Sequence, residues 1–120
     1  MFKLMIVDDS AMIRMQLASL YQGDQFDLVA EAADGEQAVE KFREFKPDVV
    51  TMDLTMPNVD GIACIEKLVN IDSSVRILVV SALNDKMTGM EALEKGAMGF
   101  IHKPISQEKV VQALSIIIED

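Results

Sequence analysis

Five polar residues stand where short apolar runs end, and three of them are carboxylates that could together bind a metal ion. Asp8 and Asp9 end the first run, Asp53 the third and Ser81 the fourth, and Lys103 follows the fifth. In a parallel sheet, ligands bind beyond the carboxyl ends of the strands, so these side chains are expected at one edge. Three neighbouring carboxylates repel one another and need a cation to coexist. Mg²⁺ prefers hard oxygen ligands and is the ion that this set predicts.

The elements that position these residues alternate along the chain. Apolar runs typical of strands cover Lys3–Val7, Phe26–Ala32, Asp48–Asp53, Val75–Ser81 and Met98–His102. Segments with helical spacing cover Ser10 to about Tyr21, Glu36–Phe45, Asp60 to about Asn70, Asp85 to about Lys95 and Ser106 to about Ile118. Strands that alternate with helices predict parallel βα units, and right-handed crossovers arrange them as a doubly wound α/β sandwich. The nearly continuous apolar strands agree, because parallel sheets are covered on both faces.

Composition narrows the class of protein. The length of 120 residues is that of one domain, expected to span 1–120. A net charge of −9 disfavours direct binding to nucleic acid, which requires a basic surface. No apolar stretch approaches the roughly 20 residues that span a bilayer, and the N-terminus is too short for a signal peptide, so a cytoplasmic protein is expected. Cys64, the single cysteine, cannot form an intramolecular disulfide and is expected to be a half-buried helix residue.

Six short motifs occur in a characteristic order. They are Val7-Asp8-Asp9-Ser10, Met52-Asp53-Leu54-Thr55-Met56-Pro57, Asp60-Gly61, Val80-Ser81-Ala82, Gly96-Ala97 and Lys103-Pro104. With these motifs the chain resembles the receiver domains of bacterial two-component response regulators, and in size it resembles the stand-alone CheY-like type. The resemblance extends from Lys3 to the last helix. It implies a flavodoxin-like five-stranded parallel sheet of order 2-1-3-4-5 with five flanking helices.

The resemblance implies a role for each carboxylate. Asp53 would be the phosphoacceptor, which takes a phosphoryl group from the phosphohistidine of a histidine kinase. Asp9 and Asp53 would bind Mg²⁺ directly, Asp8 would contribute through water, and the backbone carbonyl of Thr55 would complete the protein ligands. The chemistry is consistent, because phosphoryl transfer depends mainly on positioning and on neutralising charge.

The resemblance also implies how phosphorylation is sensed. Ser81 and Lys103 would each contact a phosphoryl oxygen, and the Lys103–Pro104 peptide bond is expected to be cis. On phosphorylation Ser81 would move toward the phosphoryl group and Phe100 would turn inward. The alternative for Phe100 is a plain core aromatic. His102 is expected to be an ordinary, partly exposed histidine.

A downstream effector protein would bind the face formed by the fourth helix, fifth strand and fifth helix. Lys86, Met87 and Met90 are candidates on that face, although core packing is the commoner explanation for methionines. The uncharged residues Thr55 and Leu83 flank the expected phosphoryl group. Leu83 cannot orient an attacking water, which predicts slow autodephosphorylation. The protein is expected to act as a monomer that switches rather than as a turnover enzyme, and chemotaxis is one pathway that fits.

Three other functions remain open from the sequence. A haloacid-dehalogenase-type phosphatase also uses Mg²⁺ and a nucleophilic aspartate, but it places a second aspartate two residues later, where this chain has Thr55. A degenerate receiver would act as an interaction module without phosphorylation. The chain could also be a receiver cut from a longer response regulator, or an intermediate in a phosphorelay.

Overall fold

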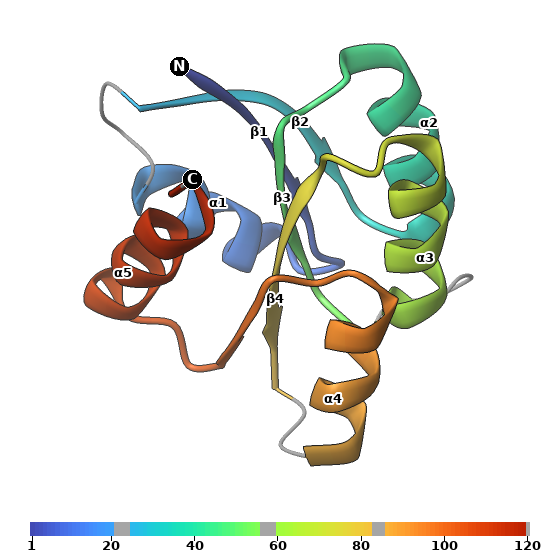
Figure 1. The fold of residues 1–120 in the computed structure, drawn as a ribbon. Helices are drawn as coiled ribbons and strands as arrows, with labels where there is room; N and C mark the ends of the chain where they lie inside the picture. The colour runs from blue at the N-terminus through green and yellow to red at the C-terminus, as the bar shows by residue number, and fades with distance from the viewer. Residues whose placement is uncertain (21–24, 56–59, 83–85, 120) are drawn as a thin grey trace.

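The computed structural model describes residues 1–20, 25–55, 60–82 and 86–119. In these ranges five strands alternate with five helices (Figure 1). The strands are β1 (Phe2–Val7), β2 (Phe26–Ala32), β3 (Val49–Met52), β4 (Arg76–Ser81) and β5 (Gly99–His102). The helices are α1 (Ala11–Leu20), α2 (Gly35–Phe45), α3 (Gly61–Ile71), α4 (Lys86–Lys95) and α5 (Gln107–Ile117). The predicted element types and their order are confirmed. The predicted helix end at Tyr21 and helix start at Asp85 lie outside the described residues.

All strand pairs are parallel, and their order in the sheet is β2-β1-β3-β4-β5. Helices α1 and α5 cover one face of the sheet, and α2, α3 and α4 cover the other (Figure 1). This arrangement confirms the predicted flavodoxin-like, doubly wound fold. No helix in the described part of the chain is long and apolar enough to cross a membrane.

The central strands are apolar because both of their faces are covered. All four residues of β3 are buried, as are the last four of β1. Alternate side chains enter two separate cores, one closed by Leu17 of α1 and Leu114 of α5, the other by Phe42 of α2 and Leu68 of α3. Full burial of each such side chain contributes roughly 1.5–3 kcal/mol. This packing gives the strand ends a rigid support.

The two edge strands carry features that discourage further pairing. Pairing between β1 and β2 shifts between Leu4, which pairs with Leu28, and Met5, which pairs with Ala30, so Val29 is an extra residue. A bulge of this kind increases the local twist and disfavours addition of another strand. At the other edge β5 has only four residues.

Side-chain caps fix where several helices begin. Asp34, Asp60 and Ser106 each accept a hydrogen bond from a backbone N–H in the first turn of α2, α3 and α5. Ser10 Oγ, just before α1, accepts one from Ile13 N–H at 3.2 Å. Each such cap is worth about 1 kcal/mol.

The prediction that Cys64 is half-buried was wrong, because this residue of α3 is fully buried.

Candidate functional site

The three predicted aspartates meet at the carboxyl edge of the sheet. Val7 pairs with Met52, so the residues that follow β1 and β3 lie side by side, and Asp53 N–H donates to Val7 O at 2.9 Å. One carboxylate oxygen from each of Asp8, Asp9 and Asp53 lies within 4.8 Å of the others. Asp8 and Asp53 are each only 1% exposed, whereas Asp9 is exposed. The cluster therefore opens to solvent on the Asp9 side.

Lys103 reaches this cluster from the end of β5. Its Nζ lies 2.8 Å from Asp8 Oδ2 and 3.8 Å from Asp53 Oδ2. The backbone N–H of Lys103 donates to Ser81 O at 2.9 Å, which ties the ends of β4 and β5 together. The Lys103–Pro104 peptide bond is cis, as expected. The ammonium group thus faces two of the three carboxylates.

The hydrogen bonds of the cluster distinguish its oxygens. Asp8 Oδ1 accepts from Ser10 N–H at 2.9 Å, and Asp8 Oδ2 accepts from Lys103. Asp53 Oδ1 accepts from both the N–H and the hydroxyl of Thr55, each at 3.2 Å. Asp53 Oδ2 is left facing Lys103.

The electrostatics of the cluster favour a bound cation. Burial raises the pKa of Asp53 above its ordinary value, and the charge of Asp8 raises it further. The Thr55 N–H and the Lys103 charge lower the pKa of Asp53, but they do not cancel the rise. The donors are carboxylate oxygens, which Mg²⁺ prefers, and a divalent ion would relieve the repulsion between them. The residues present therefore fit Mg²⁺.

The remaining predicted residues lie around this centre. Ser81 is fully buried at the end of β4. Phe100 is half-buried on β5, where a Cβ at Gly89 of α4 would lie 3.6 Å from its ring. His102 is exposed, and its ring centroid lies 5.0 Å from that of Phe100. Leu83 lies outside the described residues. The roles of Ser81 and Phe100 in switching stay predictions.

Three contributions were missed by sequence reasoning. Thr55 was expected to offer its backbone carbonyl, a role that stays a prediction, whereas the structure shows its N–H and hydroxyl on Asp53. A Cβ at Gly61 would lie 2.4 Å from Leu54 Cα, so a glycine is required where α3 begins against the backbone that follows Asp53. The Asp60-Gly61 motif was the available signal. Arg14, which donates to Asp8 O at 2.7 Å, had no such signal.

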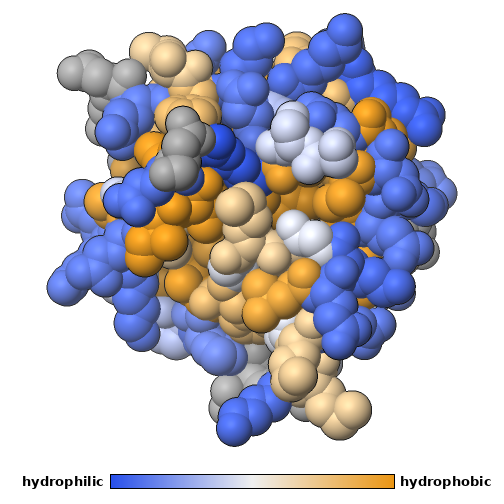
Figure 2. All heavy atoms as spheres, in the orientation of Figure 1, coloured by the Kyte–Doolittle hydropathy of each residue, from blue (hydrophilic) through white to orange (hydrophobic). Residues whose placement is uncertain are grey.

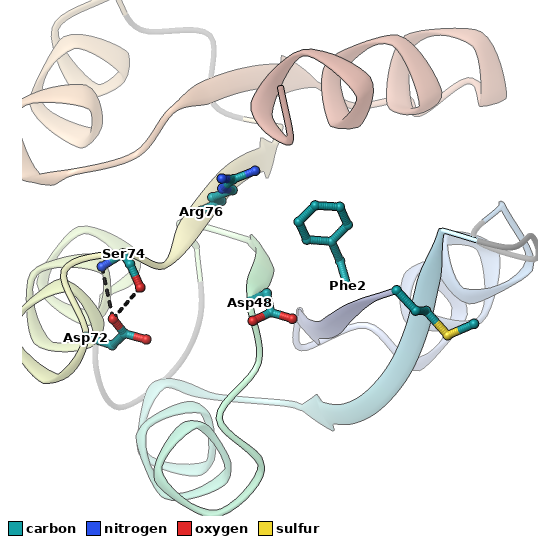
Figure 3. Close-up of a pocket in the computed structure, with 6 residues that line it drawn as sticks. Phe2, Asp48, Asp72, Ser74 and Arg76 are labelled. Carbon is teal, nitrogen blue, oxygen red and sulfur yellow. Dashed lines mark hydrogen bonds between the residues drawn. The ribbon is translucent and has the colours of Figure 1, made fainter. Parts of the chain in front are cut away.

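A second hollow, of about 320 Å³, lies at the opposite, amino end of the strands (Figure 3). Phe2, Asp48, Asp72, Ser74 and Arg76 line it. The Arg76 guanidinium lies 5.5 Å from the Phe2 ring centroid, and Asp72 accepts two hydrogen bonds from Ser74. These contacts shape the turn before β4. Ligands of parallel α/β sheets bind at the other edge, where the acidic cluster lies.

Comparison with known proteins identifies the family of the chain. The sequence model of the response regulator receiver domain matches residues 4–115, and the chain belongs to this family. Chemotaxis protein CheY of Bacillus subtilis is 41% identical over 113 residues, which are 94% of each chain. The CheX–CheY–BeF₃–Mg²⁺ complex from Borrelia burgdorferi contains a chain that is 37% identical, with a TM-score of 0.92 over 98% of this chain and 90% of that one.

Receivers of this kind also occur within longer proteins. A protein-glutamate methylesterase/protein-glutamine glutaminase of Syntrophomonas wolfei is 45% identical over 107 residues, which cover 87% of this chain but 30% of that protein. The chain is thus a receiver domain of two-component signalling, a family of switches that work with histidine kinases and downstream effectors. CheY proteins of chemotaxis are among its homologues.

Proposed function

We propose that this protein is a phosphorylation-activated switch in which Asp53 accepts a phosphoryl group from a histidine kinase. The observation that carries the proposal is the buried Asp53 carboxylate, with one oxygen held by Thr55 and the other facing Lys103. Asp53 Oδ2 would attack phosphorus as the bond from phosphorus to the kinase imidazole breaks and its electron pair returns to the ring nitrogen. The product is an acyl phosphate on Asp53.

The residues around Asp53 would offset the charge of the incoming group. Asp9, Asp53 and the Thr55 carbonyl would hold Mg²⁺, with Asp8 acting through water, and the ion when bound neutralises phosphoryl charge. Lys103 would contact a phosphoryl oxygen, since its Nζ already lies 3.8 Å from Asp53 Oδ2, the oxygen proposed to attack phosphorus. Ser81, at the end of β4, would contact another. Such preorganised charges are the main source of catalysis in phosphoryl transfer.

Acetyl phosphate supplies a direct test in the presence of Mg²⁺. The wild-type protein should gain one phosphoryl group by intact-mass spectrometry, and Asp53→Asn should gain none. Asp27→Asn is the matched control, because Asp27 is an exposed aspartate on β2. Phosphorylation of the Asp53→Asn variant would overturn the assignment.

The contacts of Thr55 favour a switch over a phosphatase. A haloacid-dehalogenase-type enzyme carries its general acid at this position, whereas Thr55 donates both its N–H and its hydroxyl to Asp53. A threonine hydroxyl cannot protonate a leaving group as a carboxylic acid does. We therefore expect no turnover of small phosphate esters, and a colorimetric phosphatase assay tests this. Steady turnover by the wild type that is lost in Asp53→Asn would show that the protein acts as a phosphatase.

The proposed output face lies where β5 passes between α4 and α5, at the front of Figure 1. Figure 2 shows apolar surface in the middle of this face and toward α4, with hydrophilic residues around it. Met87 and Met90 of α4 are 77% and 61% exposed, so core packing does not explain them. Exposed methionines suit an adaptable protein-binding surface. Movement of Ser81 and Phe100 would alter this face on phosphorylation.

We further propose that residues 1–120 form one monomeric receiver domain that acts in the cytoplasm, in chemotaxis, without binding nucleic acid directly. The CheY homologues support the pathway, and the net charge of −9 supports a protein partner. The alternatives are a receiver within a longer regulator and a phosphorelay intermediate.

Capture with the beryllofluoride-loaded protein, compared with Asp53→Asn, should recover a motor or chemotaxis protein. Recovery of a histidine phosphotransfer protein instead would favour the relay.

A further inference from the structure

Arg14 of α1 links three elements beside the acidic cluster. One guanidinium nitrogen donates to the backbone oxygen of Asp8 at 2.7 Å, and Nε donates to Glu31 Oε1 of β2 at 3.2 Å. The Arg14 side chain is 19% exposed, so most of it is packed against the protein. An ion pair at the protein surface such as Arg14–Glu31, in which the Glu31 side chain is 44% exposed, adds little stability by itself. Its effect is to hold the guanidinium in one orientation.

The bonded oxygen belongs to the peptide group that joins Asp8 to Asp9. The orientation of this peptide group sets the direction in which the Asp9 side chain leaves the backbone. Asp8 has further anchors, since its carboxylate accepts from Ser10 N–H and from Lys103. Asp9 is exposed, so the chain around it depends more on backbone contacts. Arg14 is thus placed to orient the more exposed of the two aspartates.

We propose that Arg14 is a positioning residue for the divalent cation, acting through the Asp8–Asp9 peptide group. The inference rests on the proposed Mg²⁺ site. A guanidinium suits this task because its rigid, planar set of donors can hold a carbonyl and a carboxylate at once. Lysine has one charged nitrogen on a flexible stem and cannot reproduce both contacts with the same geometry.

Two possible effects of Arg14 on metal binding have opposite signs. As a positive charge near the carboxylates, Arg14 would repel a cation, so its removal would strengthen Mg²⁺ binding. As a positioning residue it favours the binding geometry, so its removal would weaken Mg²⁺ binding. Loss of a residue that orients a metal ligand typically costs about tenfold or more in affinity. The direction of the change therefore identifies the role.

The test is a Mg²⁺ titration of the unphosphorylated protein followed by ¹H–¹⁵N NMR. Arg14→Gln should raise the Mg²⁺ dissociation constant about tenfold, and Arg14→Lys should raise it by a smaller factor. Arg43→Gln is the matched control: Arg43 is exposed in the last turn of α2, and its loss removes the same charge. This control should stay within about twofold of wild type, the change expected for a distant screened charge.

The outcomes separate this inference from the function on which it rests. If wild type binds Mg²⁺ and Arg14→Gln binds it equally well or more tightly, the role of Arg14 is overturned and the proposed site stands. If wild type does not bind Mg²⁺, both are overturned. Thermal melts by circular dichroism identify any variant that is unfolded at the titration temperature. If Arg14→Gln is unfolded, Arg14→Lys, which retains the charge, replaces it in the comparison of Mg²⁺ dissociation constants with wild type.

Discussion

At the scale of single residues, the acidic cluster combines chemical competence with a local loss of stability. Asp8 and Asp53 are buried together, and Lys103 is the cation whose ammonium group faces both carboxylates. Lys103 lies closer to Asp8, the carboxylate whose other oxygen is bonded to Ser10. Asp53 lies farther from Lys103, at 3.8 Å, and its pKa is raised above the ordinary value chiefly by burial. The charge of the residue that we propose as the phosphoacceptor is therefore unfavourable in the folded state.

Replacing Asp53 by asparagine should therefore stabilise the metal-free protein. Because burial raises the folded-state pKa of Asp53, ionised Asp53 destabilises the fold at pH values above that pKa. This penalty should shrink as the pH falls through the folded-state pKa toward the unfolded value of about 3.9. At neutral pH we expect Asp53→Asn to add about 1 kcal/mol to the free energy of unfolding, measured with urea. A gain that does not diminish toward low pH would contradict this explanation.

Leu83 is the second residue whose chemistry can be tested directly. The side chain is apolar and cannot orient water, so Leu83→Glu should shorten the half-life of phosphorylated Asp53. The decay is followed in Mg²⁺ by mass spectrometry after the phosphodonor is removed. Leu93→Glu, at an exposed position on α4, controls for the added charge. An unchanged half-life in Leu83→Glu would contradict this explanation of slow autodephosphorylation.

At the scale of elements, α4 and its C-terminal turn carry two glycines with different structural roles. Gly89 lies inside the helix, and a Cβ there would meet Phe100 at 3.6 Å, an ordinary contact distance. Gly96 follows the helix with φ of +124°, and a Cβ there would lie 2.6 Å from Val69 Cγ2. The first glycine is replaceable, whereas the second is required by its backbone conformation and by its close approach to α3.

This contrast predicts opposite effects of the same substitution. Gly89→Ala should stabilise the protein by up to about 1 kcal/mol, because alanine is the better helix former. Gly96→Ala should destabilise it by roughly 1 kcal/mol or more, because the residue then occupies a strained conformation against Val69. Thermal melts of the two variants provide the comparison. Equal shifts in the same direction would show that helix propensity, and not local geometry, governs both positions.

Elements were also the part of the structure most accessible from sequence. The apolar runs predicted every strand, because strands covered on both faces cannot contain many polar residues. Helix α3 shows where this reasoning fails. It packs against both α2 and α4, so Cys64 is buried although a half-buried residue was expected. How many neighbours cover a helix depends on tertiary packing, which helical periodicity does not encode.

At the scale of the whole molecule, the parallel sheet explains why the main site residues were predictable. Once five strands run in the same direction, the residues that follow them must meet at one edge, which placed Asp8, Asp9, Asp53 and Lys103. The contacts of Thr55 and Arg14 were not predictable in this way. They depend on the path of the turns after β1 and β3, which strand periodicity does not determine.

The buried thiol of Cys64 connects the site with the stability of the whole fold. Burial raises the pKa of this thiol to about 11 and excludes solvent, so the folded protein should react slowly with a disulfide reagent at pH 8. Labelling then requires opening of the core. A ligand that binds only the folded state divides the opening equilibrium constant by one plus the ratio of its free concentration to its Kd, so Mg²⁺ with beryllofluoride should slow labelling of the wild type.

The comparison that tests this coupling uses Asp53→Asn, which lacks the acceptor carboxylate but retains Cys64. We expect Mg²⁺ with beryllofluoride to slow thiol labelling several-fold in wild type and to leave the Asp53→Asn rate unchanged, as followed by absorbance of the released chromophore. Labelling in denaturant gives the rate for the exposed thiol. Rapid labelling of the folded wild type would show that α3 opens locally, because the rest of the core need not unfold for the reagent to reach Cys64. Slow labelling that is insensitive to beryllofluoride would instead show that ligand binding at the strand ends does not stabilise this core.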